Sequence, residues 1–264
     1  MPETRPLDAL ARTARRWLEQ AYVEHLRRQV LAGAIPRHVA VILDGNRRYA
    51  RRLGLTPTDG HLLGSETLER LLDWCRKLGV HTLTVYALST ENLRRDPAEV
   101  QALMDLFARK LAELTEDPRV HRHRIRVRAL GRLDRLRPDV AAAAARAETA
   151  TARYDNFEFR ICLAYGGRQE IVDAVRSIAD DVAAGRLHPA AVDEQLLGER
   201  LCAGADEPDL LIRTGGEVRL SNFLLFQVAY SELVFTDVHF PAFRELDFLR
   251  IVRTYQQRTR RFGR

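Results

Sequence analysis

Residues 38–44 read HVAVILD, a short apolar run, rich in β-branched residues, that ends on an aspartate. Runs of this kind are typical of strands that are buried on both faces of a parallel sheet. Outward from it, similar runs predict strands at 80–88, 124–130, 157–164, 209–212 and 231–236. Helical patterns separate them, at 46–53, 61–78, 97–115, 137–152, 168–184, 189–202 and from Glu245 onward. Strands that alternate with helices predict an α/β fold: a single domain with a central, mostly parallel six-stranded sheet flanked by helices.

A further helical pattern precedes the first strand. Over 7–32, apolar residues recur at helical spacing with arginine and glutamate between them, and glycine and proline follow as stop signals. We therefore divide the chain into an N-terminal amphipathic helix, 1–35, and a main domain, 36–264. Within the main domain, the composition of GLTPTDG at 54–60 predicts a loop.

The composition of the 264 residues is that of a globular protein: 46% are hydrophobic and 30% are charged, which argues against disorder. No apolar run approaches the ~18 residues that a membrane-spanning helix needs, and the N-terminus lacks the apolar stretch of a secretory signal. The three cysteines form no C-x-x-C pair, which argues against a disulfide scaffold and a cysteine-built zinc site. These features predict a cytoplasmic protein.

Arginine dominates the basic residues. The formal net charge is +6, and Lys77 and Lys110 are the only lysines among 42 basic residues. A GC-rich genome, which favours arginine and alanine codons, explains this bias without any function. Anion recognition explains it equally well, because the guanidinium group binds phosphate oxygens bidentately. Composition alone leaves phosphorylated small molecules, nucleic acid and an anionic membrane surface open as partners.

Arginine also follows four of the predicted strands, at the ends where open α/β sheets bind ligands. The four segments are DGNRR at 44–48, STENLRR at 89–95, YGGR at 165–168 and RTGGEVRLS at 213–221. Three of them contain glycine, which lets backbone N–H groups approach an anion closely. Two separated phosphate-binding clusters suggest two phosphorylated substrates and a transfer reaction between them.

The aspartate that ends the first strand, Asp44, would repel a phosphate unless a cation lay between them. Magnesium typically joins one or two carboxylates to substrate phosphates, so Asp44 predicts a Mg2+ site. Motifs for other reactions are missing. The chain contains no G-x-x-x-x-G-K-[ST] loop, no G-x-G-x-x-G after a strand, no G-x-S-x-G elbow and no D-D-x-x-D signature. This disfavours a P-loop NTPase, a nicotinamide-binding enzyme, a serine hydrolase and a trans-prenyl synthase.

Four segments resemble the signatures of the cis-prenyltransferases, the undecaprenyl diphosphate synthase family. They are HVAVILDGNRRYARRLGL at 38–55, YALSTENLRRDPAEV at 86–100, AYGGRQEIVDAV at 164–175 and DLLIRTGGEVRLSNFLLFQVAYSELVFTDVHFPAF at 209–243. The resemblance covers about residues 36–264, and its motifs are highly specific. It identifies the main domain as a catalytic domain.

The resemblance implies a Mg2+-dependent isoprenyl transferase. Such an enzyme condenses isopentenyl diphosphate with an allylic diphosphate (geranyl, farnesyl or geranylgeranyl) and forms a cis double bond. The resemblance also implies a homodimer and an apolar tunnel for the growing tail, whose walls we place on the helices at 61–78 and 97–115. Release of a lipid product suggests peripheral contact with the inner face of the membrane. Aromatic residues make up only 7% of the chain and lie mostly in apolar runs, so we expect no nucleic acid partner.

Individual residues take implied roles from the same resemblance. Asp44 and Asn92 match the catalytic positions, and Asp44 and Glu232 match the two carboxylates that hold magnesium. In the family, the counterpart of Glu232 can act across the dimer. The substrate-binding positions are Gly45, Asn46, Arg47, Arg48, Tyr49, His61, Ser89, Thr90, Glu91, Arg95, Arg213, Arg219, Leu220 and Ser221. Those at 45–48 match the loop that cradles the allylic diphosphate, and those at 213–221 match the isopentenyl diphosphate site.

Two departures from the family pattern affect these roles. Arg47 stands where the family usually has glycine, and an arginine that the family often carries later is replaced by Pro57 or Thr58. Arg47 therefore offers a replacement for the missing phosphate ligand. The C-terminal Arg261-Phe262-Gly263 resembles a tail that reaches the partner's site in some relatives.

The product length stays open at this point. Ala87 lies two residues before Ser89 on the same face of a predicted strand, and a small side chain there leaves room for a long tail. Arg47 and Leu93 instead resemble features of the short-chain branch. We expect a medium or long product, with a short-chain Z-farnesyl diphosphate-type synthase and a head-to-middle condensing enzyme as alternatives. A non-catalytic partner subunit is a third alternative, although such subunits typically lack the aspartate and asparagine of the first signature, which this chain retains.

Overall fold

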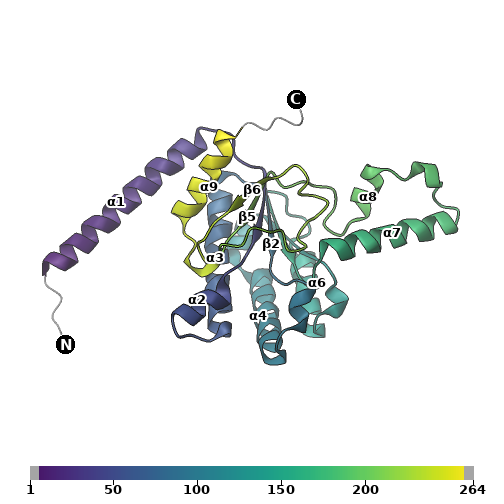
Figure 1. Ribbon diagram of the computed structural model, residues 1–264, viewed down its shortest axis with the longest axis horizontal. Coiled ribbons are helices and arrows are strands. Elements are labelled where there is room, and N and C mark those ends of the chain that lie inside the picture. The colour runs from purple at the N-terminus through teal and green to yellow at the C-terminus, as the bar shows by residue number, and fades with distance from the viewer. Residues whose placement is uncertain (1–5, 259–264) are drawn as a thin grey trace. The chain divides into compact units, whose positions relative to one another are not determined.

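The computed structural model describes residues 6–258 (Figure 1), so Arg261-Phe262-Gly263 lies outside the described residues. The described chain divides into two compact units. One comprises the described parts of 1–36 and 244–264, and the other comprises 37–243. All predicted site residues belong to the second unit.

The second unit is built on one six-stranded sheet. Its strands are β1 (His38–Ile42), β2 (Thr82–Tyr86), β3 (Ile125–Leu130), β4 (Phe157–Cys162), β5 (Leu210–Arg213) and β6 (Glu232–Phe235). They lie in the order β3-β4-β2-β1-β5-β6, and every adjacent pair is parallel. The expected α/β fold is confirmed, and its sheet is wholly rather than mostly parallel. Ile42 of β1 pairs with Tyr86 of β2 and Arg213 of β5, so the carboxyl ends of these strands form one edge.

Helices connect the strands of this unit (Figure 1). They are α2 (Asn46–Arg52), α3 (Pro57–Leu78), α4 (Pro97–Glu116), α5 (Pro118–Arg122), α6 (Pro138–Thr151), α7 (Gly167–Ala183) and α8 (Glu194–Arg200). Short 3-10 turns are η1 (Glu91–Arg94), η2 (Leu133–Arg135), η3 (Pro189–Ala191) and η4 (Phe240–Ala242). Two of the helices, α3 and α4, pack against each other and border the cavities described below.

The helix α3 begins earlier than predicted. The loop prediction for 54–60 is wrong in its second half, because the helix starts at Pro57. The Thr56 hydroxyl accepts a hydrogen bond from the Asp59 amide (3.2 Å), and the Asp59 carboxylate accepts one from the Thr56 amide (2.9 Å). This capping box, with proline at the first helical position, outweighs the loop composition of the segment.

The helix α8 is shorter than the one predicted at 189–202. A 3-10 turn occupies Pro189–Ala191, and α8 starts only at Glu194, after Asp193, whose carboxylate caps its first turn. The short helix α5 has no counterpart in the prediction. Pro118 interrupts the helical pattern after α4, because proline cannot continue a helix, and it starts a new one.

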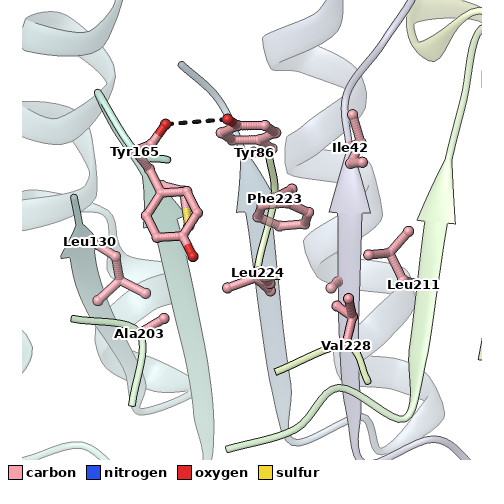
Figure 2. Packing of buried hydrophobic residues seen from close by; sticks show 11 residues of the cluster. Ile42, Tyr86, Leu130, Tyr165, Ala203, Leu211, Phe223, Leu224 and Val228 are labelled. Atoms are coloured by element: carbon pink, nitrogen blue, oxygen red, sulfur yellow. Dashed lines mark hydrogen bonds between the residues drawn. The ribbon is translucent and has the colours of Figure 1, made fainter. Parts of the chain in front are cut away.

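One face of the sheet packs against the segment that follows β5 (Figure 2). Phe223 of that segment is fully buried and stacks on Tyr86 of β2, with ring centroids 4.6 Å apart. The Tyr86 hydroxyl donates a hydrogen bond to the backbone oxygen of Tyr165 (3.2 Å). Leu224 and Val228 lie in the same cluster. This core anchors the chain directly after the predicted isopentenyl diphosphate residues.

The first unit pairs the helices α1 (Pro6–Leu31) and α9 (Glu245–Gln257). Arg27 of α1 donates two hydrogen bonds to the Glu245 carboxylate (3.0 and 2.7 Å) at the start of α9. Across both units, the described helices include none that is long and apolar enough to cross a membrane.

Candidate active site

The carboxyl edge of the sheet carries a cavity of about 560 Å³. It is bordered by the segments that follow β1, β2 and β5 and by parts of α3 and α4. Twelve of the predicted site residues line it: Asp44, Gly45, Asn46, Arg47, Arg48, His61, Ser89, Asn92, Arg95, Arg213, Arg219 and Ser221. Residues from distant stretches of the sequence meet here because the strands that carry them end at one sheet edge.

Asp44 lies at the centre of the polar wall of this cavity. Its Oδ1 accepts a hydrogen bond from Arg48 (3.0 Å), and its Oδ2 accepts one from Arg213 (2.9 Å). Burial is the largest single influence and raises the pKa of Asp44. The two hydrogen bonds and the two positive charges together outweigh burial, so the pKa lies below its usual value. Asp44 is therefore ionised at neutral pH and is held between two guanidinium groups.

Thr214 fixes the backbone of Asp44. Its hydroxyl accepts a hydrogen bond from the Asp44 amide (3.0 Å) and donates one to the Asp44 carbonyl oxygen (2.7 Å). Thr214 is fully buried and directly follows β5. It therefore joins the end of β1 to the end of β5. The two predicted substrate sites, which follow these strands, are held together by this contact. No motif singles out Thr214. Its position directly after the predicted strand end at Arg213 was the one signal that it lies near the site.

Gly45 makes the turn between β1 and α2. Its φ of 105° lies in a region that other residues rarely adopt, and a Cβ there would lie 2.9 Å from His239. The tight turn lets α2 begin at Asn46, directly after the strand end. Arg47 and Arg48, in the first turn of this helix, thereby reach the cavity that Asp44 borders.

Arg213 links Asp44 to the segment after β5. Its side chain is only 5% exposed, and it donates hydrogen bonds to the Ser221 hydroxyl (2.7 Å) and to the backbone oxygen of Arg219. Ser221 has a φ of 49°, in the left-handed region that residues other than glycine rarely occupy. The buried guanidinium thus holds a strained segment in place, with Ser221 and Arg219 at the cavity wall.

Glu217 pairs with two of the predicted substrate ligands. Its carboxylate oxygens lie 2.7 Å from an Arg219 nitrogen and 3.6 Å from an Arg48 nitrogen. Both arginines are exposed, with 62% and 40% of their side chains accessible. Because exposed ion pairs are weak, both guanidinium groups can turn from Glu217 toward a bound phosphate. Sequence spacing does not reveal this role, because Glu217 meets Arg48 only in the folded chain.

The segment after β2 is held by two reciprocal hydrogen bonds. The Asn92 side-chain oxygen accepts one from the Ser89 amide (3.3 Å), and the Ser89 hydroxyl accepts one from the Asn92 amide (3.1 Å). Glu91 accepts a further hydrogen bond from the Asn222 side chain (3.1 Å). These contacts fix Asn92 at the cavity wall and tie its segment to the one that follows β5.

Glu99 gathers three of the predicted substrate ligands. Its side chain is 9% exposed, and its Oε1 lies 3.0 Å from Arg95, 3.4 Å from His61 and 3.7 Å from Arg47. Burial and the positive charges of Arg95 and Arg47 together lower the pKa of His61 more than Glu99 raises it, so His61 is neutral at pH 7. Glu99 is absent from the predicted site, because a glutamate three residues after Asp96 is typical of an ordinary helix start. The arginine that replaces the family's glycine is thus positioned by a carboxylate of α4.

Five predicted residues lie outside the cavity lining: Tyr49, Thr90, Glu91, Leu220 and Glu232. Leu220 instead packs against the core cluster that contains Phe223. Glu232 opens β6 and pairs with Leu210, so it lies toward the amino edge of the sheet, whereas Asp44 lies beyond the carboxyl edge. One chain therefore does not bring the two predicted metal ligands together, and Glu232 could join Asp44 only from a second copy.

A second, largely apolar cavity of about 520 Å³ adjoins the first. The two cavities share the lining residues Ser65, Leu68, Ala87, Leu106 and Phe107. The walls of the second cavity come from α3, α4 and one sheet face, as the tunnel prediction requires. Ile161 of β4 borders this cavity, whereas its neighbour Cys162 lies in the core cluster on the opposite face. The polar cavity therefore opens past Ala87 into an apolar one.

A family model described as putative undecaprenyl diphosphate synthase matches residues 42–263. The chain belongs to this family. A curated relative, the tritrans,polycis-undecaprenyl-diphosphate synthase (geranylgeranyl-diphosphate specific) of Thermococcus kodakarensis, is 56% identical over 245 residues, or 92% of this chain and 93% of that protein. An isoprenyl transferase of Thermus thermophilus is 47% identical over 253 residues, or 94% of this chain and 95% of the relative.

Solved structures share the fold of this chain. The lavandulyl diphosphate synthase from Lavandula x intermedia, in complex with dimethylallyl diphosphate, is 36% identical with a TM-score of 0.84, covering 87% of this chain and 99% of that one. A probable undecaprenyl diphosphate synthase from Campylobacter jejuni is 30% identical with a TM-score of 0.72, covering 88% and 100%. The expected family, fold and reaction class are confirmed: the chain is a cis-prenyltransferase.

The helices α2 and α3 approach each other closely at Gly60, and a substitution there tests how much this contact matters. A Cβ at Gly60 would lie 2.4 Å from the backbone oxygen of Asn46, and no side-chain rotation relieves that clash. We expect Gly60→Ala to displace α2, to lower the stability by about 1–3 kcal/mol and to raise the KM for the allylic substrate. Denaturant unfolding and steady-state kinetics measure both effects, with Thr58→Ala on the exposed start of α3 as the control. Wild-type behaviour of Gly60→Ala would show that the two helices separate at no cost.

Proposed function

We propose that this enzyme condenses isopentenyl diphosphate repeatedly onto geranylgeranyl diphosphate and makes a medium-chain Z-polyprenyl diphosphate. The observation that carries the proposal is the continuity of the polar cavity around Asp44 with the apolar cavity beyond Ala87. A diphosphate head fits the first cavity, and a growing hydrocarbon tail fits the second. The Thermococcus relative is named for geranylgeranyl diphosphate, which favours that primer over geranyl or farnesyl diphosphate.

In this proposal the allylic diphosphate binds at the start of α2. Gly45 and Asn46 form the turn, and Arg47 and Arg48 supply the positive charge. Arg47 is exposed, and its pair with Glu99 is long at 3.7 Å, so it can turn to a phosphate oxygen. The two guanidinium groups offset the charge that develops on the diphosphate as it leaves.

Asp44 fits a magnesium ion as a single carboxylate ligand. Magnesium typically binds through one or two carboxylates, substrate phosphates and water. The residues that the structure describes contain no group of three acidic, histidine or cysteine side chains placed to hold a metal, so substrate phosphates would complete the site. When bound, the ion would neutralise phosphate oxygens of the leaving group. Glu232 of the same chain lies at the other edge of the sheet, so it can be a metal ligand only if it comes from a second copy. We therefore propose a homodimer in which Glu232 of one copy reaches the site of the other.

Isopentenyl diphosphate binds at Arg213, Arg219 and Ser221 in this scheme. The allylic C–O bond breaks, the electron pair leaves with the diphosphate, and the double bond of isopentenyl diphosphate attacks the cation-like carbon to form the new C–C bond. A proton then leaves C2 for a diphosphate oxygen. Asn92 orients the substrate rather than removing this proton, because a neutral amide is a weak base and its oxygen already accepts a hydrogen bond from Ser89.

We further propose a cytoplasmic enzyme that contacts the inner face of the membrane peripherally when it releases its lipid product. All three cysteines, Cys75, Cys162 and Cys202, are free thiols, which supports a reducing compartment.

Product analysis tests the proposed activity. The purified protein is incubated with Mg2+, isopentenyl diphosphate and, in separate reactions, geranyl, farnesyl or geranylgeranyl diphosphate, and the products are identified by mass spectrometry. We expect the highest kcat/KM with geranylgeranyl diphosphate, several additions per chain, and loss of turnover when the ion is chelated. A single addition from every primer would favour the short-chain alternative, and an irregular product would favour the head-to-middle one.

Ala87 controls the passage between the two cavities. We expect Ala87→Leu to shorten the products by one or more isoprene units, because the larger side chain would fill cavity space that the growing tail needs. Mass spectrometry of products from one primer measures the change. Ala112→Leu, an equal enlargement at an exposed position of α4, serves as the control. An unchanged product distribution would place Ala87 outside the path of the tail.

A further inference from the structure

The apolar cavity runs along α3 and α4, away from the polar cavity. On α3 the lining moves from 61–68 in the polar cavity to 65–76 in the apolar one. On α4 it moves in the same way, from 103–107 to 106–114. Ile125, the first residue of β3, also borders the apolar cavity. The far end of this cavity therefore lies toward the amino edge of the sheet, opposite the diphosphate-binding edge.

Charged side chains border the apolar cavity between its junction with the polar cavity and this far end. The Lys110 ammonium on α4 lies 2.8 Å from Glu69 of α3 and 2.9 Å from Glu113 of α4. Arg119 of α5 lies 3.5 Å from Glu69 and 2.7 Å from Asp117. All five residues line this largely apolar cavity, and we call them the α3–α4 ion network. The network joins three helices alongside the cavity, starting within one turn of the residues Leu68 and Phe107 that the two cavities share.

Lys110 is the cation that joins α4 to α3. It is one of only two lysines in a chain rich in arginine, and its side chain is 26% exposed. The apolar stem of a lysine can lie along a cavity wall while the ammonium group bonds at the rim. Burial lowers the pKa of Lys110, but hydrogen bonds and charge from Glu69 and Glu113 raise it above its usual value. The ammonium group is therefore charged throughout the physiological range.

A tail that outgrows the apolar cavity meets this network. A cavity of about 520 Å³ is of the size that encloses a drug-sized ligand, which is smaller than a polyprenyl chain of many isoprene units. Further growth then requires α3 and α4 to part, which breaks the pair between Lys110 and Glu69. It also brings hydrocarbon against charged groups and removes water from them, which opposes each further addition.

We propose that the α3–α4 ion network holds α3 and α4 together along the apolar cavity and thereby limits how many isoprene units the enzyme adds. This inference rests on the proposed function, because it needs a growing tail inside the cavity. The pairs are partly exposed and weak one by one, so the network restrains the helices without locking them. Removing the link between Lys110 and Glu69 lets the tail extend farther between the helices.

Two variants test the inference against a matched control. Lys110→Met keeps the length of the side chain and removes its charge, and Glu69→Gln removes the charge on the opposite helix. Lys77→Met is the control, because the other lysine pairs with Asp73 (2.6 Å) within α3 and does not line the cavity. Products from geranylgeranyl and isopentenyl diphosphate are measured by mass spectrometry at equal turnover, and thermal unfolding checks that each variant folds.

We expect both network variants to make products longer by one or more isoprene units, with Lys77→Met unchanged. Added NaCl, which screens partly exposed charges, should lengthen the wild-type products more than those of Lys110→Met, which keeps only the Arg119 pairs of the network. Wild-type product lengths in both folded network variants would overturn the role of the network and leave the proposed function standing. A wild-type protein that makes no polyprenyl diphosphate from any primer would overturn the proposed function and the network's role together.

Discussion

We expect Asp44→Ala to lower kcat/KM on the order of 10^3-fold or more, because several kcal/mol of leaving-group stabilisation disappear with the carboxylate. Asp44 is ionised and lies between Arg48 and Arg213. In the proposed reaction its carboxylate would hold a magnesium ion that stabilises the leaving diphosphate, and the variant lacks this carboxylate. Steady-state kinetics at saturating Mg2+ measures the loss.

Asp44→Asn separates the charge of this residue from its shape. Its amide oxygen can still accept a hydrogen bond from a guanidinium group, so we expect the fold to persist while activity falls nearly as far as in the alanine variant. Circular dichroism and thermal unfolding monitor the fold of both variants. Activity of a folded variant within about tenfold of wild type would refute the role assigned to Asp44.

We expect Arg213→Ala to raise the KM for isopentenyl diphosphate on the order of 100-fold, because it removes charge-assisted hydrogen bonds of about 1.5–3 kcal/mol each. The buried guanidinium also holds Ser221 and the backbone at Arg219, so its loss releases the rest of that site. Kinetics in which each substrate is varied at saturation of the other measures the effect.

Arg219→Ala serves as the comparison, because this side chain is 62% exposed and pairs with Glu217 at the surface. Its loss should raise the same KM by roughly tenfold, the effect of one charge-assisted contact, and leave the stability unchanged. A rise in the KM for the allylic primer alone, in either variant, would mean that the two diphosphate sites are reversed.

Much of the fold could be predicted because its strands are short apolar runs. HVAVI at 38–42 is buried throughout, and its short length and β-branched residues distinguish it from a buried helix. The position of the site followed from the same pattern, since polar residues directly after such strands meet at one edge. Asp44 and Arg213 are far apart in sequence, yet they are ion-paired because β1 and β5 are neighbours.

The supporting residues could not be predicted in this way. Glu99 and Glu217 also reach Arg47 and Arg48, which only the tertiary structure brings near them, and local spacing assigns each glutamate an ordinary helix-start or loop role. Glu232 is different, because the sequence contained the signal. It stands near the start of a predicted parallel strand, which places it at the opposite edge from Asp44 within one chain.

Glu217 has a consequence for the order of events at the site. It pairs with Arg48, on the proposed allylic side, and with Arg219, on the proposed isopentenyl diphosphate side. When a diphosphate binds one of these arginines and takes it from Glu217, the carboxylate remains paired with the other arginine alone. Such coupling is reciprocal, so the first ligand changes the affinity for the second by the same factor as the second changes the affinity for the first. We therefore expect the two substrates to bind as a linked pair, and an inhibitor that fills one proposed diphosphate site to shift the measured affinity of the other.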